Sequence, residues 1–542
     1  MSDRGKNAVF LIIDALRYDV AANPDAFRLL MPNLAALAEA GLLRRVVANA
    51  QSTQFVLPSL FTLSYPLDHG GYNNGIRDRP KSFVEVLREN GFKTALYATA
   101  NQIGLGNGYQ RGFDIIGTSS DYRTQLEHKI ARTLSYDIGR WKRGEISEAE
   151  LISTVRQDFG ELLDRLVESL EKHDRSIWPL RLARTNDRVG RGCRAERALL
   201  NSNPAAVLHK LQHIAPGVYW RFLGQEKVGR FELFRARAAE AINWRMRELV
   251  GKQNWFPFLP LQYHQVIFGD IVDRLCRVVE GFGADRWFIH MHMMDVHDCR
   301  SMNRPLHLLY RLKYLPRWLR ARAEGGIRRR YIYDSAAMYV DECLGRFLAF
   351  MRQTGRMQNT VFLAVADHAY QYAESPRSKT PVGERMHYED IEVPLVMYAA
   401  AGLPDAKPEG TLDSRAVSAG FLQALDIPLH ASFSAASVFN GGSRAAISES
   451  CGSGAVDLAR RDIFFAVTGT RYKIFAVLSG SVLRITQLYD LAADPREMAN
   501  RITDMQIRPE AEALADFLLE ERRALFALRG IASRDGVQYG RL

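Results

Sequence analysis

Acidic side chains follow two strongly apolar stretches of the chain at the point where each stretch ends. Asp14 comes directly after residues 9–13 (VFLII), and Asp367 follows residues 360–366 (TVFLAVA). Apolar runs of this length, rich in β-branched residues, are typical of fully buried strands in a parallel sheet. The second acid is followed at once by His368. A carboxylate and an imidazole at a strand end are well placed to bind a metal ion.

A third apolar stretch, residues 286–292, leads to His297. Open α/β sheets bind their ligands at the carboxyl edge, where parallel strands end together. We therefore expect His297 to lie beside His368 and the two acids. Hard oxygen ligands combined with imidazole suit one divalent metal ion, which could be Ca²⁺, Mg²⁺, Mn²⁺ or Zn²⁺.

Each of these residues also has an interpretation that needs no metal. Asp14 could be a helix N-cap, for which aspartate is a good residue. Asp367 and His368 could simply begin a loop, and His297 or His387 could be ordinary surface or core side chains. The convergence of three strand ends on one edge favours the metal site over these alternatives.

The segments that would position these residues alternate between strand and helix through about residue 118. Residues 94–98 are predicted to form a strand and residues 82–90 a helix with Ser82 as N-cap. A further strand is predicted at residues 393–398. This alternation predicts an α/β fold with a doubly wound, mostly parallel sheet.

Between residues 120 and 284 the character of the chain changes to predominantly helical and basic, which indicates an insertion into the sheet domain. Strand-like segments followed by a helix then predict a small C-terminal α+β subdomain. No internal repeat is evident. We therefore predict a core in two parts, residues 1–119 and 285–445. The helical insertion is predicted at residues 120–284 and the C-terminal subdomain at residues 446–542.

The composition favours an anionic partner. The chain has 542 residues, with 72 Lys and Arg against 61 Asp and Glu, which gives a net charge of +11. Basic residues concentrate at 181–197 and 304–330, and the second stretch interleaves Tyr310, Tyr314 and Trp318. Either an acidic polymer or a membrane surface fits this pattern. A nucleic-acid partner is not expected, because no recognition motif accompanies the charge.

The five cysteines are scattered, and their spacing matches neither a disulfide framework nor a thiolate metal site. The first residues lack the layout of a signal peptide, and no apolar run approaches the roughly 18 residues that a membrane span needs. We therefore expect a cytoplasmic protein, with membrane contact limited to its periphery.

Several motifs resemble those of the sulfatases within the alkaline phosphatase superfamily. The resemblance covers residues 7–118 and 286–502 but not the insertion. The matching positions are Asp14, Arg17 and Asp19; Pro32 to Gly41 (PNLAALAEAG); Gly112–Phe113–Asp114; Tyr339, Asp341, Gly345 and Arg346; Ala366–Asp367–His368–Ala369; Tyr388–Glu389 with Val393–Pro394–Leu395; and Leu488–Tyr489–Asp490–Leu491 with Asp494, Pro495, Glu497 and Asn500. The last of these is the most specific.

This resemblance implies an alkaline-phosphatase/sulfatase-like fold and a metal-dependent enzyme acting on sulfate or phosphate esters. Asp14, Asp367 and His368 would hold the ion. His297 and His387 would bind the ester oxygens or protonate the leaving group.

The sequence departs from the sulfatases at the nucleophile. Sulfatases carry Cys or Ser in C-x-P-S-R, whereas this chain has Val56-Leu57-Pro58-Ser59-Leu60, so a formylglycine mechanism is not expected. Phosphoethanolamine and phosphoglycerol transferases of the same superfamily use a threonine upstream of a similar proline. On that resemblance Thr53 is the expected nucleophile, with Ser52 as second choice. Thr53 could instead be only a helix N-cap.

Two further departures bear on the ion. Ala15 occupies the position of a second metal-binding acid, and Ala369 that of the usual glycine. The sequence thus predicts a hydrolase or transferase with a hydroxyl nucleophile, acting on phosphate or sulfate esters of a glycan or lipid head group. The alternative is a catalytically degenerate member that binds anionic polysaccharide or a biosynthetic partner.

Overall fold

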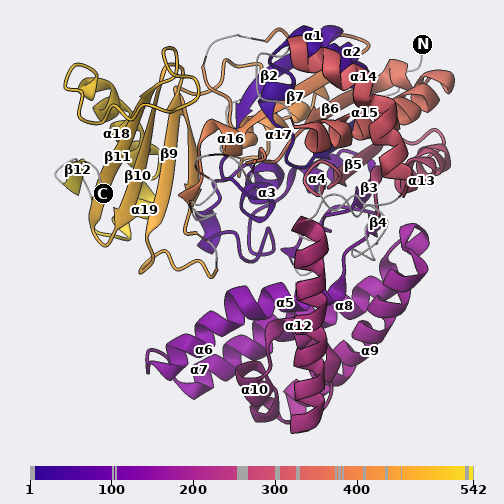
Figure 1. Cartoon of the computed structure of the whole chain (residues 1–542), viewed down its shortest axis with the longest axis vertical. Helices are drawn as coiled ribbons and strands as arrows, with labels where there is room; N and C mark the ends of the chain where they lie inside the picture. Colours follow the sequence, from indigo (N-terminus) through magenta and orange to yellow (C-terminus); the bar gives the residue numbers. More distant parts are fainter. Residues whose placement is uncertain are drawn as a thin grey trace.

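The computed structural model describes residues 6–100, 103, 107–252, 266–299, 305–324, 330–372, 375, 377, 380, 384–406, 410–433, 437–452, 454–531 and 536–540. A seven-stranded central sheet runs in the order β2-β7-β6-β1-β5-β3-β4 (Figure 1). Its strands are β1 (Asn7–Ile13), β2 (Leu42–Val47), β3 (Lys93–Ala98), β4 (Ile115–Thr118), β5 (Trp287–Met293), β6 (Thr360–Val365) and β7 (Glu392–Ala399).

The sheet is parallel except at β7, which is antiparallel to both of its neighbours, β6 and β2. This arrangement confirms the predicted α/β class with a mostly parallel sheet. The register explains how the site forms, since Ile12 of β1 lies opposite both His292 of β5 and Val365 of β6. The residues that follow these positions therefore emerge together at the carboxyl edge of the three central strands.

Two groups of helices cover the sheet. One group contains α1 (Pro24–Leu30), α2 (Pro32–Glu39), α13 (Phe268–Gly281), α14 (Pro305–Glu324) and α15 (Tyr331–Gln353). The other contains α3 (Thr53–Thr62), α4 (Phe83–Glu89) and α17 (Ser414–Ala424). Aromatic contacts of Phe10 with Phe83 and Phe421 attach this second group to β1. The three central strands are buried almost completely between the layers.

A helical lobe lies between β4 and α13 and occupies the lower part of Figure 1. It contains α5 (Tyr122–Lys129), α6 (Ser135–Lys142), α7 (Glu148–Thr154), α8 (Gly160–Lys172), α9 (Leu180–Ser202), α10 (Pro204–His213), α11 (Pro216–Tyr219) and α12 (Arg230–Lys252). Two π-helical turns, Ile130–Leu134 and Val155–Phe159, join its first helices. The four domain limits stay a prediction, although α13, expected in the insertion, packs against α15 of the core.

The last part of the chain forms a second sheet in the order β12-β11-β10-β9-β8, in the yellow region of Figure 1. The strands are β8 (Ala445–Ser450), β9 (Ile463–Gly469), β10 (Tyr472–Ser479), β11 (Val482–Asp490) and β12 (Val537–Tyr539), accompanied by α18 (Arg508–Glu521) and α19 (Arg523–Ala527). The short helix α16 (Tyr388–Ile391) precedes β7. Among the described residues, no helix is long and apolar enough to cross a membrane.

Candidate active site

The turn after β1 places Asp14 at the centre of the site. The Asp14 amide donates a hydrogen bond to the Met293 carbonyl (3.0 Å), which continues the pairing with β5 beyond the strand. Ala15 then adopts φ +63°, a left-handed conformation that is costly for a residue with a Cβ. The Tyr333 hydroxyl, which donates to the Ala15 carbonyl (2.8 Å), and Asp367 Oδ1, which accepts from the Ala15 amide (3.3 Å), hold this turn.

Imidazoles and carboxylates from β1, β5 and β6 surround Asp14. His292 Nε2 lies 2.9 Å from Asp14 Oδ2, and His368 Nε2 lies 3.5 Å from Asp14 Oδ1. His368 Nε2 is also 3.7 Å from Asp367 Oδ2. Two overlapping groups, Asp14 with His297 and His368 and Asp14 with His292 and Asp367, each have donor atoms within 4.8 Å of one another.

The arrangement fits a divalent metal ion. Asp14 Oδ1 and Asp367 Oδ2 are buried and accept no hydrogen bond from the described residues. A buried carboxylate oxygen without a hydrogen-bond partner is costly, and a cation would offset that cost. His368 Nδ1 donates to the Ala369 carbonyl (2.7 Å), so in the neutral ring Nε2 presents its lone pair to the two acids.

Thr53 is the first residue of α3, and its side chain points into this cluster. The Thr53 hydroxyl donates to Asp14 Oδ2 (3.0 Å) and lies 3.2 Å from His368 Nε2. Ser52 is the N-cap residue of α3, and its side chain makes no capping hydrogen bond. The structure thus brings Thr53 into the cluster, while Ser52 serves the helix through its backbone, where its carbonyl accepts from the Phe55 and Val56 amides.

His297 lies beside His368, with the two rings edge to face and 6.0 Å between their centroids. Its Nδ1 lies 2.9 Å from Asp298 Oδ1. Burial opposes the charge on His297, but the nearby carboxylates of Asp14 and Asp298 outweigh it and raise the pKa of His297 to about 9. Burial likewise opposes ionisation of Asp14, yet the surrounding histidines hold the pKa of Asp14 below its usual range.

His387 occupies a different environment. It precedes α16 and packs against Phe475 of β10, with 4.5 Å between the ring centroids. Burial, together with the nearby cations Lys473 and Arg377, lowers the pKa of His387 to about 2. Among the described residues no recorded interaction joins His387 to Asp14, Asp367 or His368. Its expected role at the ester therefore stays a prediction.

The sequence over residues 6–176 and 224–427, more than half of the chain, matches the model of the family described as Sulfatase. The chain belongs to the sulfatase family. Both matched ranges include the candidate residues, with Asp14 and Thr53 in the first and the histidines and Asp367 in the second. The match confirms the expected resemblance to the sulfatases, a family of ester hydrolases. No curated protein matches the sequence significantly.

Solved structures with the same fold come from several enzymes. A putative sulfatase, YidJ from Bacteroides fragilis, has a TM-score of 0.54 at 12% identity, with 98% of both chains covered. The phosphonate monoester hydrolase of Agrobacterium radiobacter has a TM-score of 0.52 at 14% identity, with 96% of both chains covered. Ps i-CgsB in complex with a neocarrahexaose has a TM-score of 0.51 at 11% identity, covering 96% of this chain and 93% of that chain.

Among the described residues that could hold a metal ion, His292 is the one that the sequence did not predict. It lies inside β5 (WFIHMHM), where it was absorbed into an apparently apolar strand. Its position near the end of β5 could have indicated its role, because a histidine near the end of a strand that neighbours β1 must lie close to Asp14. It is fully buried, and its Nδ1 has no hydrogen-bond partner among the described residues.

A small polar pocket lies between α3 and the helical lobe. Its lining includes Gln54 of α3 and His128 and Arg132 of the lobe. No carboxylate pairs with Arg132 among the described residues, and burial lowers the pKa of its guanidinium. Burial and the adjacent Arg132 lower the pKa of His128 to about 4. Arg132 belongs to a π-helical turn, a feature frequent at functional sites.

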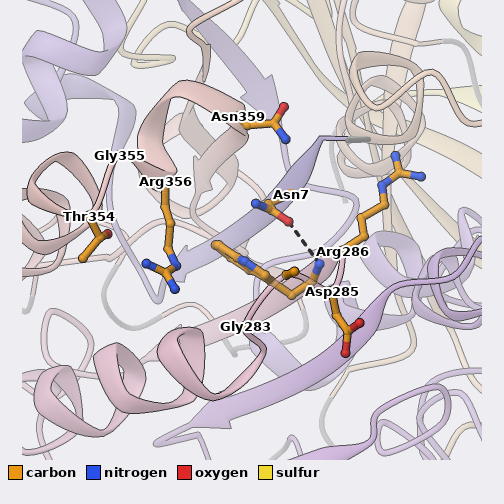
Figure 2. A pocket seen from close by; sticks show the side chains of 10 residues that line it. Asn7, Gly283, Asp285, Arg286, Thr354, Gly355, Arg356 and Asn359 are labelled. Atoms are coloured by element: carbon orange, nitrogen blue, oxygen red, sulfur yellow. Dashed lines mark hydrogen bonds between the residues drawn. The ribbon is translucent and has the colours of Figure 1, made fainter. Parts of the chain in front are cut away.

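A second cavity, of about 370 Å³, lies at the opposite edge of the central sheet (Figure 2). Its lining comes from the amino ends of β1 and β5 and from residues 354–359 before β6. Two of the lining residues are joined, since Asn7 Oδ1 accepts a hydrogen bond from the Trp287 amide (3.2 Å). Because Asp14 and Asp367 follow the carboxyl ends of these strands, this cavity is separate from the candidate active site.

Proposed function

We propose that this sulfatase-family protein cleaves or transfers a phosphate or sulfate ester with the Thr53 hydroxyl as nucleophile. The observation that carries this proposal is the position of Thr53 Oγ1, within 3.0 Å of Asp14 and 3.2 Å of His368. The N-terminus of α3 also favours negative charge at this point, because its backbone dipoles are aligned. A hydroxyl nucleophile in place of the formylglycine precursor favours phosphate over sulfate chemistry.

Asp14, Asp367 and His368 would hold one divalent ion, and His292 is an additional candidate ligand. The share of imidazole among these donors favours Zn²⁺ over Ca²⁺ or Mg²⁺, which prefer oxygen ligands, while Mn²⁺ remains compatible with the two carboxylates. When bound, such an ion supplies Lewis acidity at the ester and at a nearby hydroxyl.

The proposed reaction consists of two successive displacements. Thr53 Oγ1 forms a bond to the phosphorus or sulfur atom while the bond to the leaving oxygen breaks, and the Thr53 proton passes to Asp14 Oδ2, which accepts its hydrogen bond. His297, at the side of the cluster, gives a proton to the leaving oxygen. Water or an acceptor alcohol then displaces Thr53, regenerates its hydroxyl and carries away the transferred group.

The substrate we propose is an ester on a glycan or lipid head group that carries further negative charge. The net charge of +11 supports an anionic substrate, as does Arg132, which lines a pocket with Gln54 and pairs with no carboxylate among the described residues. The structural neighbour bound to a neocarrahexaose indicates that this fold accommodates carbohydrate.

The test compares Thr53→Ala, Thr53→Ser and the control Thr62→Ala on an aryl phosphate, a phosphodiester and an aryl sulfate. We expect Thr53→Ala to lower kcat/KM by about a thousandfold or more, because the nucleophile is lost. Thr53→Ser should keep measurable turnover, and Thr62→Ala, at the far end of α3, should remain near wild type. Undiminished activity in Thr53→Ala would contradict the assignment.

The degenerate, binding-only alternative is tested by the same samples. It predicts no turnover of any ester by the wild type and no retained divalent ion in elemental analysis, with binding to anionic polysaccharide intact. The buried, unpartnered oxygens of Asp14 and Asp367 favour the enzyme over this alternative.

A further inference from the structure

Helix α14 presents an apolar face to solvent. Leu309, Leu312 and Leu319 are 64%, 61% and 52% exposed, and Leu315 is also exposed. With roughly 100° between successive residues of an α-helix, these leucines share one side of α14. The other residues on that side, Pro316 and Ala323, are apolar and exposed as well.

The opposite side of α14 accounts for its attachment to the protein. Tyr314, Trp318 and Ala321 are buried, at the spacing of a core-facing stripe. The Trp318 indole donates to Asp334 Oδ2 (2.8 Å), and the Tyr314 hydroxyl donates to Glu342 Oε2 (2.9 Å), both on α15. The helix is therefore anchored by its aromatic face, and the leucine face plays no part in folding the described core.

Basic side chains border the leucine face on both edges. Helical spacing places Arg320 and Lys313, the latter paired with Glu342 of α15 (2.8 Å), along one edge and Arg311 and Arg322 along the other. Between positions 309 and 324 the only acidic residue is Glu324. A wide apolar face bordered by Lys and Arg is the pattern of a helix that lies in a membrane interface, with its leucines in the acyl boundary and its cations at the headgroups.

We propose that α14 docks the protein on a bilayer surface that contains anionic phospholipid. A second copy of this chain is a poorer occupant, since a self-complementary contact would bring the basic borders of two copies together. The helix is also joined to the candidate site, because Arg311 Nη2 donates to the Cys299 carbonyl (3.3 Å), two residues beyond His297. The proposal does not depend on the ester chemistry.

The experiment measures co-sedimentation of the full chain with vesicles of phosphatidylcholine and phosphatidylglycerol, and with vesicles of phosphatidylcholine alone. We expect binding to the anionic vesicles that weakens with added salt. The double variant Leu312→Gln/Leu319→Gln should lower this affinity by about tenfold or more, because two exposed leucines leave the interface. Arg320→Gln/Arg322→Gln should lower it by a similar factor on anionic vesicles only.

Leu528→Gln is the matched control, since Leu528 is 65% exposed but lies in the C-terminal region, and it should bind as wild type does. All variants should turn over a soluble aryl ester equally, which separates this test from that of Thr53. Failure of the wild type to bind anionic vesicles, or unchanged binding in the leucine variant, would overturn the proposal. So would light scattering that shows a dimer which the leucine substitutions dissociate.

Discussion

At the scale of single residues, the candidate metal ligands were predicted mainly from the side chains that follow the ends of strands. Asp14, Asp367 and His368 could be grouped from the sequence, because Asp14 and Asp367 each follow an apolar run typical of a buried strand and His368 comes next. His292 was not, because a histidine within a fully buried strand looks like a core residue until the strand order is known. The hydrogen bond from Thr53 to Asp14 could likewise not be predicted from the sequence, since it joins residues from separate elements.

The role of His292 leads to a prediction about metal affinity. We expect His292→Gln to weaken divalent-ion binding by about ten- to a hundredfold, because it removes an imidazole from beside Asp14. His290→Gln is the matched control, since His290 is equally buried in β5 but stacks on Phe10 and packs against Phe61. A competition titration with a chromogenic chelator measures both. Equal affinity in the two variants would remove His292 from the site.

At the scale of elements, helical periodicity predicted the helices but not the π-helical turns within them. The apolar spacing from Ser147 to Lys172 is that of one amphipathic helix, and the capping box of Ser147 and Glu150 is present. Inside it, however, Val155–Phe159 is a π-helical turn. That turn carries Asp158, which pairs with Arg77 of the core (3.3 Å) and Lys129 of α5 (3.2 Å). Such pairing depends on the tertiary fold and has no local sequence signal.

The helical lobe contains a buried ion pair whose loss should be costly. Lys210 Nζ lies 2.5 Å from Glu196 Oε2, and both side chains are inaccessible to solvent. The Tyr219 hydroxyl and the Gly224 amide also donate to Glu196. We expect Lys210→Met to lower the free energy of unfolding by about 3–5 kcal/mol, because it leaves the Glu196 charge buried without its cation.

Chemical denaturation of the Lys210 variant, with hydrogen exchange to locate the change in the lobe, measures this effect. The double variant Lys210→Met/Glu196→Gln should recover much of the loss, since no unpaired charge remains. A single variant as stable as the wild type would show that the pair contributes little.

At the scale of the whole molecule, the mostly parallel sheet and the C-terminal β-region followed from the order of strand and helix patterns. The order of strands within the sheet did not, because β5, separated from β4 by the entire lobe, lies between β1 and β3. Only long-range pairing determines that position. The attachment of the second sheet to the core could also not be predicted from the sequence, since it involves buried charged residues that are far apart in the chain.

Arg522 is central to that attachment. Its guanidinium donates to Glu449 of β8 (2.8 and 3.1 Å) and to Asp68 of the core (2.7 Å). We expect Arg522→Met to destabilise the protein by about 3–5 kcal/mol, because the fully buried Glu449 loses its cation. Thermal unfolding followed by calorimetry, with Arg523→Met as the exposed neighbouring control, provides the measurement. Equal unfolding temperatures in the two variants would refute this account of the attachment.

The most direct test of the central claim is to look for the covalent intermediate on Thr53. The wild type and Thr53→Ser are mixed with an activated aryl phosphate, quenched in acid during turnover, digested and examined by peptide mass spectrometry. We predict a single phosphoryl group on the peptide that begins α3, located at residue 53 by fragmentation in both proteins and absent from Thr53→Ala. A protein that turns over the ester while its adduct lies on Ser52, or forms on no residue at all, would contradict the account.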